Sequence, residues 1–108
     1  MDWLTKKCVP CEGGVPPIPA ERANELLATL EGWSLKDGKL WKQLRFANFR
    51  EAIRFVNAAA ELAEAEGHHP DLSLHDYRLL DVTLSTHAIG GLSDNDFIVA
   101  AKLDALPR

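Results

Sequence analysis

Apolar residues recur at the spacing of an amphipathic helix in two segments of the chain. Residues 20–32 place leucine and alanine side chains one helical turn apart and end at a glycine. Residues 48–67 carry a longer stripe, with Asn48 as a cap, Glu51 three positions later and Gly67 as a stop. Alanines at the centre of this stripe predict the close approach of a neighbouring element. Two helices are therefore predicted.

Two other segments alternate apolar and polar residues, which is the pattern of half-buried strands. In residues 33–46, the Asp-Gly pair at 37–38 favours a two-residue hairpin turn, which sets Leu35 opposite Leu40. Residues 72–87 predict a second pair of strands. We therefore expect two separate hairpins.

The last segment predicts a third helix, because Ser93 can cap it and Asp96 follows as the reciprocal acid. The order of elements is then α-β-β-α-β-β-α. It favours an α+β domain, with a four-stranded antiparallel sheet and three helices packed on one face. Glycines and prolines break up the first part of the chain, so residues 1–18 predict a flexible N-terminal arm and residues 19–108 a single domain.

Composition narrows the function classes. The chain has 108 residues, of which 46% are hydrophobic and 26% charged, and this is a globular composition. The net charge of -4 argues against nucleic-acid or anionic-membrane binding. No apolar run approaches the roughly 20 residues of a membrane-spanning helix, and the N-terminus does not resemble a signal peptide. A cytoplasmic location is the resulting expectation.

The two cysteines, Cys8 and Cys11, form a CxxC motif in an irregular Gly/Pro-rich segment. A redox motif of this kind normally begins a helix that follows a strand, and a single CxxC is half of a zinc site. The main interpretation is a pair of reduced thiols without a function, with metal and redox roles as alternatives.

Three of the four histidines lie between residues 67 and 77. His68 and His69 follow the end of the second helix and His87 follows a strand, so both ends can face one cleft. Imidazole titrates near ~6.5 and can donate or accept a proton at working pH. Glu64, one turn before His68, could raise the pKa of a neighbouring histidine or orient its ring.

Three interpretations of the histidines remain open from this pattern: solvated loop residues, metal ligands and acid–base catalysts. The metal interpretation is weak, because adjacent side chains diverge in extended chain and zinc spacings are absent. A Ser/His/Asp triad using Ser85 or Ser93 lacks a nucleophile-elbow motif.

The spacing of these residues resembles the signature of the pterin-4a-carbinolamine dehydratases. That signature has a charged residue, then His-His-Pro, an aromatic, a Thr-His and an aspartate in the last helix. The resemblance spans about residues 19–105. The matching positions are Glu64, His68, His69, Pro70, Tyr77, His87 and Asp96.

The resemblance implies dehydration of 4a-hydroxytetrahydropterin to quinonoid dihydropterin and water, without a metal or organic cofactor. This reaction recycles the cofactor of the aromatic amino acid hydroxylases. His68 and His87 would form the acid–base pair, and His69 would be a third active-site histidine that binds and orients the pterin. The substrate-binding residues implied are Glu64, Gly67, Pro70, Ser85, Thr86, Ala88 and Asp96.

Three of the matching residues also have a structural interpretation. Pro70 would form a rigid turn, Tyr77 would be a packed strand aromatic, and Asp96 would cap a helix. Ala88 stands where many relatives carry an acid. The implied assembly is a homodimer or homotetramer, with no nucleic-acid or membrane partner. The alternative function is non-catalytic, because members of the family also serve as transcriptional dimerisation cofactors or as assembly chaperones of the carbon-fixing carboxylase.

Overall fold

The computed structural model describes residues 2–10 and 16–108. Its four strands form one antiparallel sheet in the order β1-β2-β4-β3, and the predicted order of helices and strands is confirmed. The helices are α1 (Ala20–Leu27), α2 (Phe49–Glu66) and α3 (Asp94–Asp104), with short 3-10 turns η1 (Trp3–Thr5) and η2 (His87–Ile89). The strands are β1 (Ser34–Lys36), β2 (Lys39–Arg45), β3 (Asp71–His75) and β4 (Leu79–Leu84).

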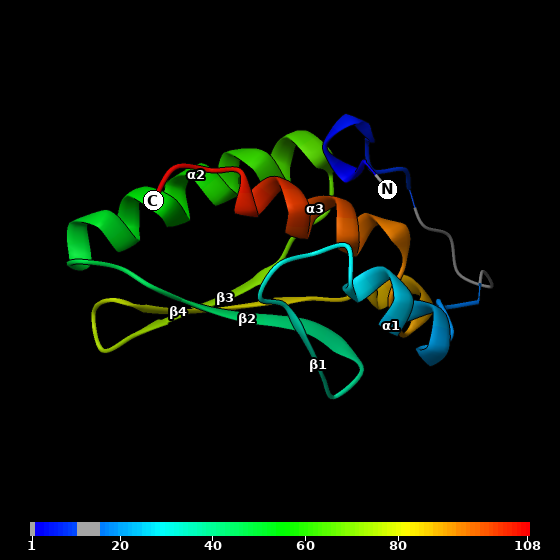
Figure 1. Cartoon of the computed structure of the whole chain (residues 1–108). Helices are drawn as coiled ribbons and strands as arrows, with labels where there is room; N and C mark the ends of the chain where they lie inside the picture. The colour runs from blue at the N-terminus through cyan, green and yellow to red at the C-terminus, as the bar shows by residue number, and fades with distance from the viewer. Residues whose placement is uncertain (1, 11–15) are drawn as a thin grey trace.

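The sheet and the two longer helices make two layers. Figure 1 shows α2 and α3 lying over one face of the sheet, while α1 lies at one end of it, near β1. No helix within the described ranges is long and apolar enough to cross a membrane.

The covered face of the sheet is the apolar one. Leu40 pairs with Leu84, and Leu44 with Leu80, and all four side chains are buried. The expected pairing of Leu35 with Leu40 is confirmed. Because side chains alternate between the two faces of a strand, the open face carries mostly polar residues. The register therefore follows directly from the apolar alternation.

Both long-helix starts have the predicted caps. The Asn48 side chain accepts a hydrogen bond from the Glu51 amide, and Ser93 and Asp96 form a reciprocal capping box. The first helix is shorter than expected, because α1 ends at Leu27 rather than near residue 32. After Leu27 the helical hydrogen bonds give way to a tighter turn, in which the Thr29 hydroxyl and amide both donate to the Leu26 carbonyl, three residues earlier.

Residues 2–10, part of the predicted N-terminal arm, pack against the rest of the chain. The Trp3 ring is 3% exposed, stacks on Phe97 with centroids 5.5 Å apart, and donates to the Thr29 hydroxyl at 2.8 Å. Cys8 is buried as well. Burial of the large Trp3 indole against the core stabilises the docked position of this segment, although its backbone is irregular. Cys11, the other half of the CxxC, lies outside the described residues.

The Cys8 thiol is expected to be unreactive in the folded protein. Burial raises its pKa from 9.0 to about 12, and the nearby Glu66 carboxylate adds to the shift. Since the thiolate is the nucleophile, a Cys11→Ser variant should react with Ellman's reagent at pH 8 on the order of 10³-fold more slowly than a free thiol. Full reaction in 6 M guanidinium is the control. Rapid reaction of the native variant would contradict the burial of Cys8.

Candidate functional site

The end of α2 positions the paired histidines. Gly67 adopts a left-handed conformation with φ 69°, which ends the helix. The amides of Gly67 and His68 both donate to the Ala63 carbonyl, at 2.9 and 3.3 Å. A side chain at residue 67 would be strained in this conformation, so glycine fits the position. The turn directs the chain from α2 into β3.

His68 is held by a buried carboxylate. Its Nε2 lies 2.6 Å from Asp96 Oδ1, and the Asp96 side chain is 0% exposed while that of His68 is 12% exposed. The second carboxylate oxygen, Oδ2, accepts from the Thr86 hydroxyl at 2.8 Å and from the Ser93 amide at 3.0 Å. A single aspartate therefore joins the end of α2, the start of α3 and the segment after β4.

This contact fixes how His68 can exchange protons. An ionised carboxylate accepts, so this contact favours the tautomer with hydrogen on Nε2 and leaves Nδ1 for a further partner. The carboxylate also stabilises the positive charge that the ring acquires when Nδ1 is protonated. Asp96 does this in addition to its role in the capping box, so the predicted structural role and a role at the site coexist in one residue.

His87 lies in the short 3-10 turn that follows β4. Thr86 and Gly91 form an isolated bridge, in which the Thr86 amide donates to the Gly91 carbonyl at 2.7 Å. His87 begins η2 and is exposed. It lines a cavity of about 240 Å³ with the following residues: Asp37, Gly38, Lys39, Ser85, Thr86, Gly90 and Gly91. Thr86 thus connects the cavity wall to Asp96 and through it to His68.

Both histidine segments lie at the same end of the sheet. Asp71, the first residue of β3, pairs with Thr83, one residue before the end of β4. His68 and His69 precede that pair on one strand, and His87 follows it on the other. The antiparallel register therefore places the two predicted catalytic segments at the same end of the sheet. Of the three predicted histidines, His87 lines the cavity described above, whereas His68 and His69 are not among its lining residues.

Glu64 and His69 form a second, exposed pair. Glu64 Oε2 hydrogen-bonds His69 Nε2, and the two side chains are 73% and 61% exposed. Glu64 therefore contacts His69, whereas the ring of His68 contacts Asp96. Of the other predicted residues, Gly67 and Pro70 flank the histidines, Ser85 lines the cavity, and Ala88 lies exposed in η2.

The structure adds three residues that sequence reasoning assigned only to a turn. Asp37, Gly38 and Lys39 come from the β1–β2 hairpin and line the cavity with His87. The pairing of Leu40 with Leu84 places this turn beside the end of β4. The signal in the sequence was the turn itself, because the pairing of Leu40 with Leu84 joins residues that are 44 positions apart.

The other two members of the histidine-rich stretch lie elsewhere. His75 ends β3 at the far hairpin, and its Nε2 lies 3.0 Å from Asp81 Oδ2. Burial opposes ionisation of Asp81, but hydrogen bonds from Gln43 and His75 hold its pKa below the usual range. Tyr77 lies in the hairpin turn with φ 51° and is 58% exposed, so the expectation of a packed strand aromatic was wrong.

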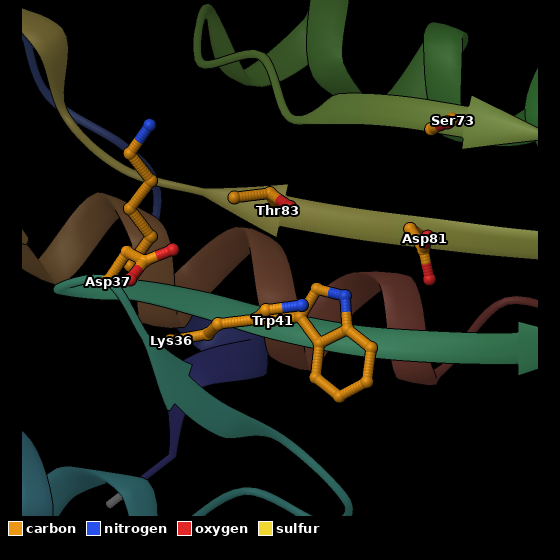
Figure 2. A pocket seen from close by; sticks show the side chains of 7 residues that line it. Lys36, Asp37, Trp41, Ser73, Asp81 and Thr83 are labelled. Atoms are coloured by element: carbon orange, nitrogen blue, oxygen red, sulfur yellow. The ribbon is translucent and has the colours of Figure 1, made fainter.

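Another cavity, of about 330 Å³, lies on the open face of the sheet. Figure 2 shows its walls, with Lys36 beside Trp41 and the lysine nitrogen 4.8 Å from the ring centroid. The full lining is Lys36, Asp37, Lys39, Trp41, Ser73, Asp81 and Thr83. It contains no histidine, so the cavity with His87 is the better candidate for proton-transfer chemistry.

Comparison with known proteins assigns the chain to a family. The sequence model described as pterin 4 alpha carbinolamine dehydratase matches residues 16–106. The chain belongs to the pterin-4-alpha-carbinolamine dehydratase family. The matched range includes every predicted site residue, from Glu64 to Asp96.

Relatives of this family are similar over nearly the whole chain. A protein of Nitrosomonas eutropha is 49% identical over 106 residues, which cover 97% of this chain and 93% of the relative. A protein of Methylococcus capsulatus is 50% identical over 103 residues, covering 94% and 90%. Both carry a provisional pterin-4-alpha-carbinolamine dehydratase name.

Two solved structures share the fold. A transcriptional coactivator/pterin dehydratase from Brucella melitensis is 33% identical, with a TM-score of 0.77 over 82% of this chain and 96% of that chain. A pterin dehydratase-like protein described as a RuBisCO assembly factor in the alpha-carboxysome is 26% identical, with a TM-score of 0.56 over 68% of this chain and 83% of that chain. The dehydratase fold therefore occurs in proteins described by different functions.

Proposed function

We propose that the protein dehydrates 4a-hydroxytetrahydropterin to quinonoid dihydropterin and water, in the recycling of a tetrahydrobiopterin-type cofactor. The observation that carries the proposal is the chain of contacts from His68 through buried Asp96 to Thr86, the neighbour of His87. The capping box accounts for one oxygen of buried Asp96, and the other oxygen binds the ring of His68, which the cap does not need.

The reaction needs one proton donor and one proton acceptor. The carbon–oxygen bond at carbon 4a breaks as the hydroxyl receives a proton and leaves as water. A ring nitrogen loses its proton, and the released electron pair forms the new carbon–nitrogen double bond. His68 is suited to accept this proton at Nδ1, because Asp96 stabilises the resulting imidazolium. His87 then donates to the departing hydroxyl.

The remaining residues bind and orient the pterin in this proposal. Backbone groups of residues 67–69 and 85–88 would hold the polar edge of the ring, and Asp37 and Lys39 line the cavity with His87. The volume of about 240 Å³ lies just below the roughly 300–1,000 Å³ of drug-sized ligand sites, which suits a small bicyclic ring that stays partly open to solvent.

The direct test is the rate at which the absorbance of 4a-hydroxytetrahydropterin decays. The purified protein should accelerate this decay above the uncatalysed rate in proportion to its concentration. Pterins with different side chains at carbon 6 would be compared in the same assay. A decay rate that is independent of protein for every pterin would refute the proposal.

The exposed pair of Glu64 and His69 is expected to affect binding more than chemistry. His69→Ala should raise KM about tenfold and change kcat less than about threefold, because one hydrogen bond to substrate of about 1.4 kcal/mol is lost. Glu64→Gln should raise KM less, since His69 remains. Steady-state kinetics with the pterin distinguish the two. A large fall in kcat for His69→Ala would instead assign His69 to proton transfer.

The proposal includes a homodimer or homotetramer in the cytoplasm. β1 and β3 are the edge strands of the sheet, and an edge strand with unpaired backbone groups can pair with a second copy. Light scattering coupled to size-exclusion chromatography measures the mass directly. A monomer at micromolar concentration would remove this part of the proposal.

A protein-assembly role is the alternative function. It is favoured by the likeness to a structure described as a RuBisCO assembly factor. The dehydratase function is preferred because the chain has all three histidines, His68, His69 and His87, and because His68 is hydrogen-bonded to Asp96. Accelerated dehydration of 4a-hydroxytetrahydropterin by the purified protein alone, without any protein partner, would favour the dehydratase function.

A further inference from the structure

The N-terminal strap, residues 2–10, crosses the ends of both long helices. Figure 1 shows it beside the C-terminal end of α2 and along α3. The family's sequence model begins at residue 16, so the strap lies outside the matched range. Besides the contacts of Trp3, its hydrogen bonds to the helices fall on the last turn of α2 and the first turn of α3, next to His68 and Asp96.

On α2, the strap is bonded to the last turn. The Lys7 ammonium donates to the Ala65 carbonyl at 3.3 Å, and the Cys8 amide donates to Glu66 Oε1 at 2.9 Å. The other Glu66 oxygen accepts from Lys102 of α3 at 2.9 Å. The pKa of Glu66 is held below its usual range, first by the hydrogen bond from the Cys8 amide and then by the hydrogen bond from Lys102. Glu66 lies two residues before His68.

On α3, the strap is bonded to the first turn. Asn95 Oδ1 accepts from the Val9 amide at 3.1 Å, and Asn95 Nδ2 donates to the Val9 carbonyl at 2.6 Å. The Cys8 thiol lies 3.7 Å from the Asn95 carbonyl, which it can donate to. Asn95 is 4% exposed and directly precedes Asp96.

These bonds make the strap a bridge between the two partners of the site. The hydrogen bond of 2.6 Å between His68 and Asp96 requires the end of α2 and the start of α3 to keep a fixed separation. Displacements of about 1 Å in a supporting shell are enough to lower rates by about 100-fold. The end of α2 and the start of α3 are each bonded to the strap, and Glu66 also binds Lys102, which lies in the last turn of α3.

We propose that the N-terminal strap is a positioning element, which holds the His68–Asp96 pair through Cys8, Val9, Glu66 and Asn95. Its kinetic consequence rests on the proposed dehydratase function, whereas its structural consequence does not. The strap touches no reacting atom. It acts by keeping the ring of His68 on the carboxylate of Asp96.

The test compares Asn95→Ala with Trp3→Phe. Asn95→Ala removes both side-chain bonds to Val9. Trp3→Phe is the matched control in the same segment, because it removes the bond to Thr29 but keeps a ring against Phe97. The imidazole Nε2 proton of His68 would be followed by NMR, assigned with a His68→Gln variant, and kcat and KM would be measured for dehydration.

Asn95→Ala is expected to lose or broaden the Nε2 resonance of His68 and to lower kcat about 10- to 100-fold, with KM changed less than about threefold. Trp3→Phe should keep both the resonance and kcat, even where its melting temperature falls. If the resonance persists unchanged in Asn95→Ala, the strap does not position the pair. An inactive wild type would refute the dehydratase function, and the resonance would still decide the role of the strap.

Glu66 gives a second pair of variants in case Asn95→Ala fails to fold. Glu66→Gln keeps a side-chain oxygen that can accept from the Cys8 amide, whereas Glu66→Ala removes it. The expected result is loss of the His68 resonance and of kcat in Glu66→Ala and their recovery in Glu66→Gln. Equal behaviour of the two variants would contradict positioning through the strap.

Discussion

Replacement of both His68 and His87 by alanine is expected to lower kcat/KM for dehydration about 10⁴-fold. Each general acid or base contributes about 10²–10⁴, and the two effects overlap because both histidines act in one step. Each single variant should lose about 10²- to 10³-fold. The measurement is the rate of absorbance loss of 4a-hydroxytetrahydropterin, corrected for the uncatalysed rate.

His75→Ala is the matched control for these variants. His75 lies at the opposite end of β3 and is paired with Asp81, so kcat/KM should stay within about twofold of the wild type. Circular dichroism would verify that all the variants are folded. If the double variant keeps more than about a tenth of the wild-type kcat/KM, histidine acid–base catalysis is wrong even where the protein is active.

Replacement of Asp96 is expected to affect both stability and catalysis. Asp96→Ala removes a fully buried carboxylate that bonds His68, Thr86 and the Ser93 amide. The free energy of unfolding should fall by about 3 kcal/mol, since a buried charged network loses its central acceptor. The rate constant kcat should fall about 100-fold or more, because His68 loses the group that sets its tautomer.

Asp96→Asn separates the two roles. The asparagine oxygen can still accept from Ser93 and Thr86, so most of the stability should return, with a loss of about 1 kcal/mol. Its amide nitrogen is a donor and cannot accept from His68 Nε2, so kcat should stay low. Urea unfolding and steady-state kinetics measure the two effects. Wild-type kcat in Asp96→Asn would show that Asp96 serves only as a helix cap.

Local patterns in the sequence were enough to predict the order of helices and strands and most of their ends, although α1 ends earlier than expected. Asn48, Gly67 and the Ser93–Asp96 capping box define helix ends by bonds within a few residues, and these predictions were confirmed. The Asp-Gly turn at 37–38 fixed the first hairpin register in the same way. Interactions of short sequence separation depend little on the rest of the fold, so the sequence shows them directly.

The site was predicted less completely. The resemblance to the family singled out His68, His69, His87 and Asp96. The partner of His68 could not be deduced from the sequence, because Glu64 lies only four positions away whereas Asp96 lies 28 positions away. The structure assigns Glu64 to His69 and Asp96 to His68. The choice depends on where α3 lies relative to the end of α2, which is a property of helix packing rather than of local sequence.

By itself, the sequence determined the order of helices and strands and the apolar face of the sheet, and its resemblance to the family singled out the histidines that we propose for proton transfer. Only the tertiary structure decided that β2 pairs with β4, so that Lys39 faces His87 in one cavity, and that residues 2–10 dock on the ends of α2 and α3. The physical reason is the range of the interactions. Caps and turns form within one segment, whereas strand pairing and the burial of Trp3 join segments whose meeting depends on the packing of the whole domain.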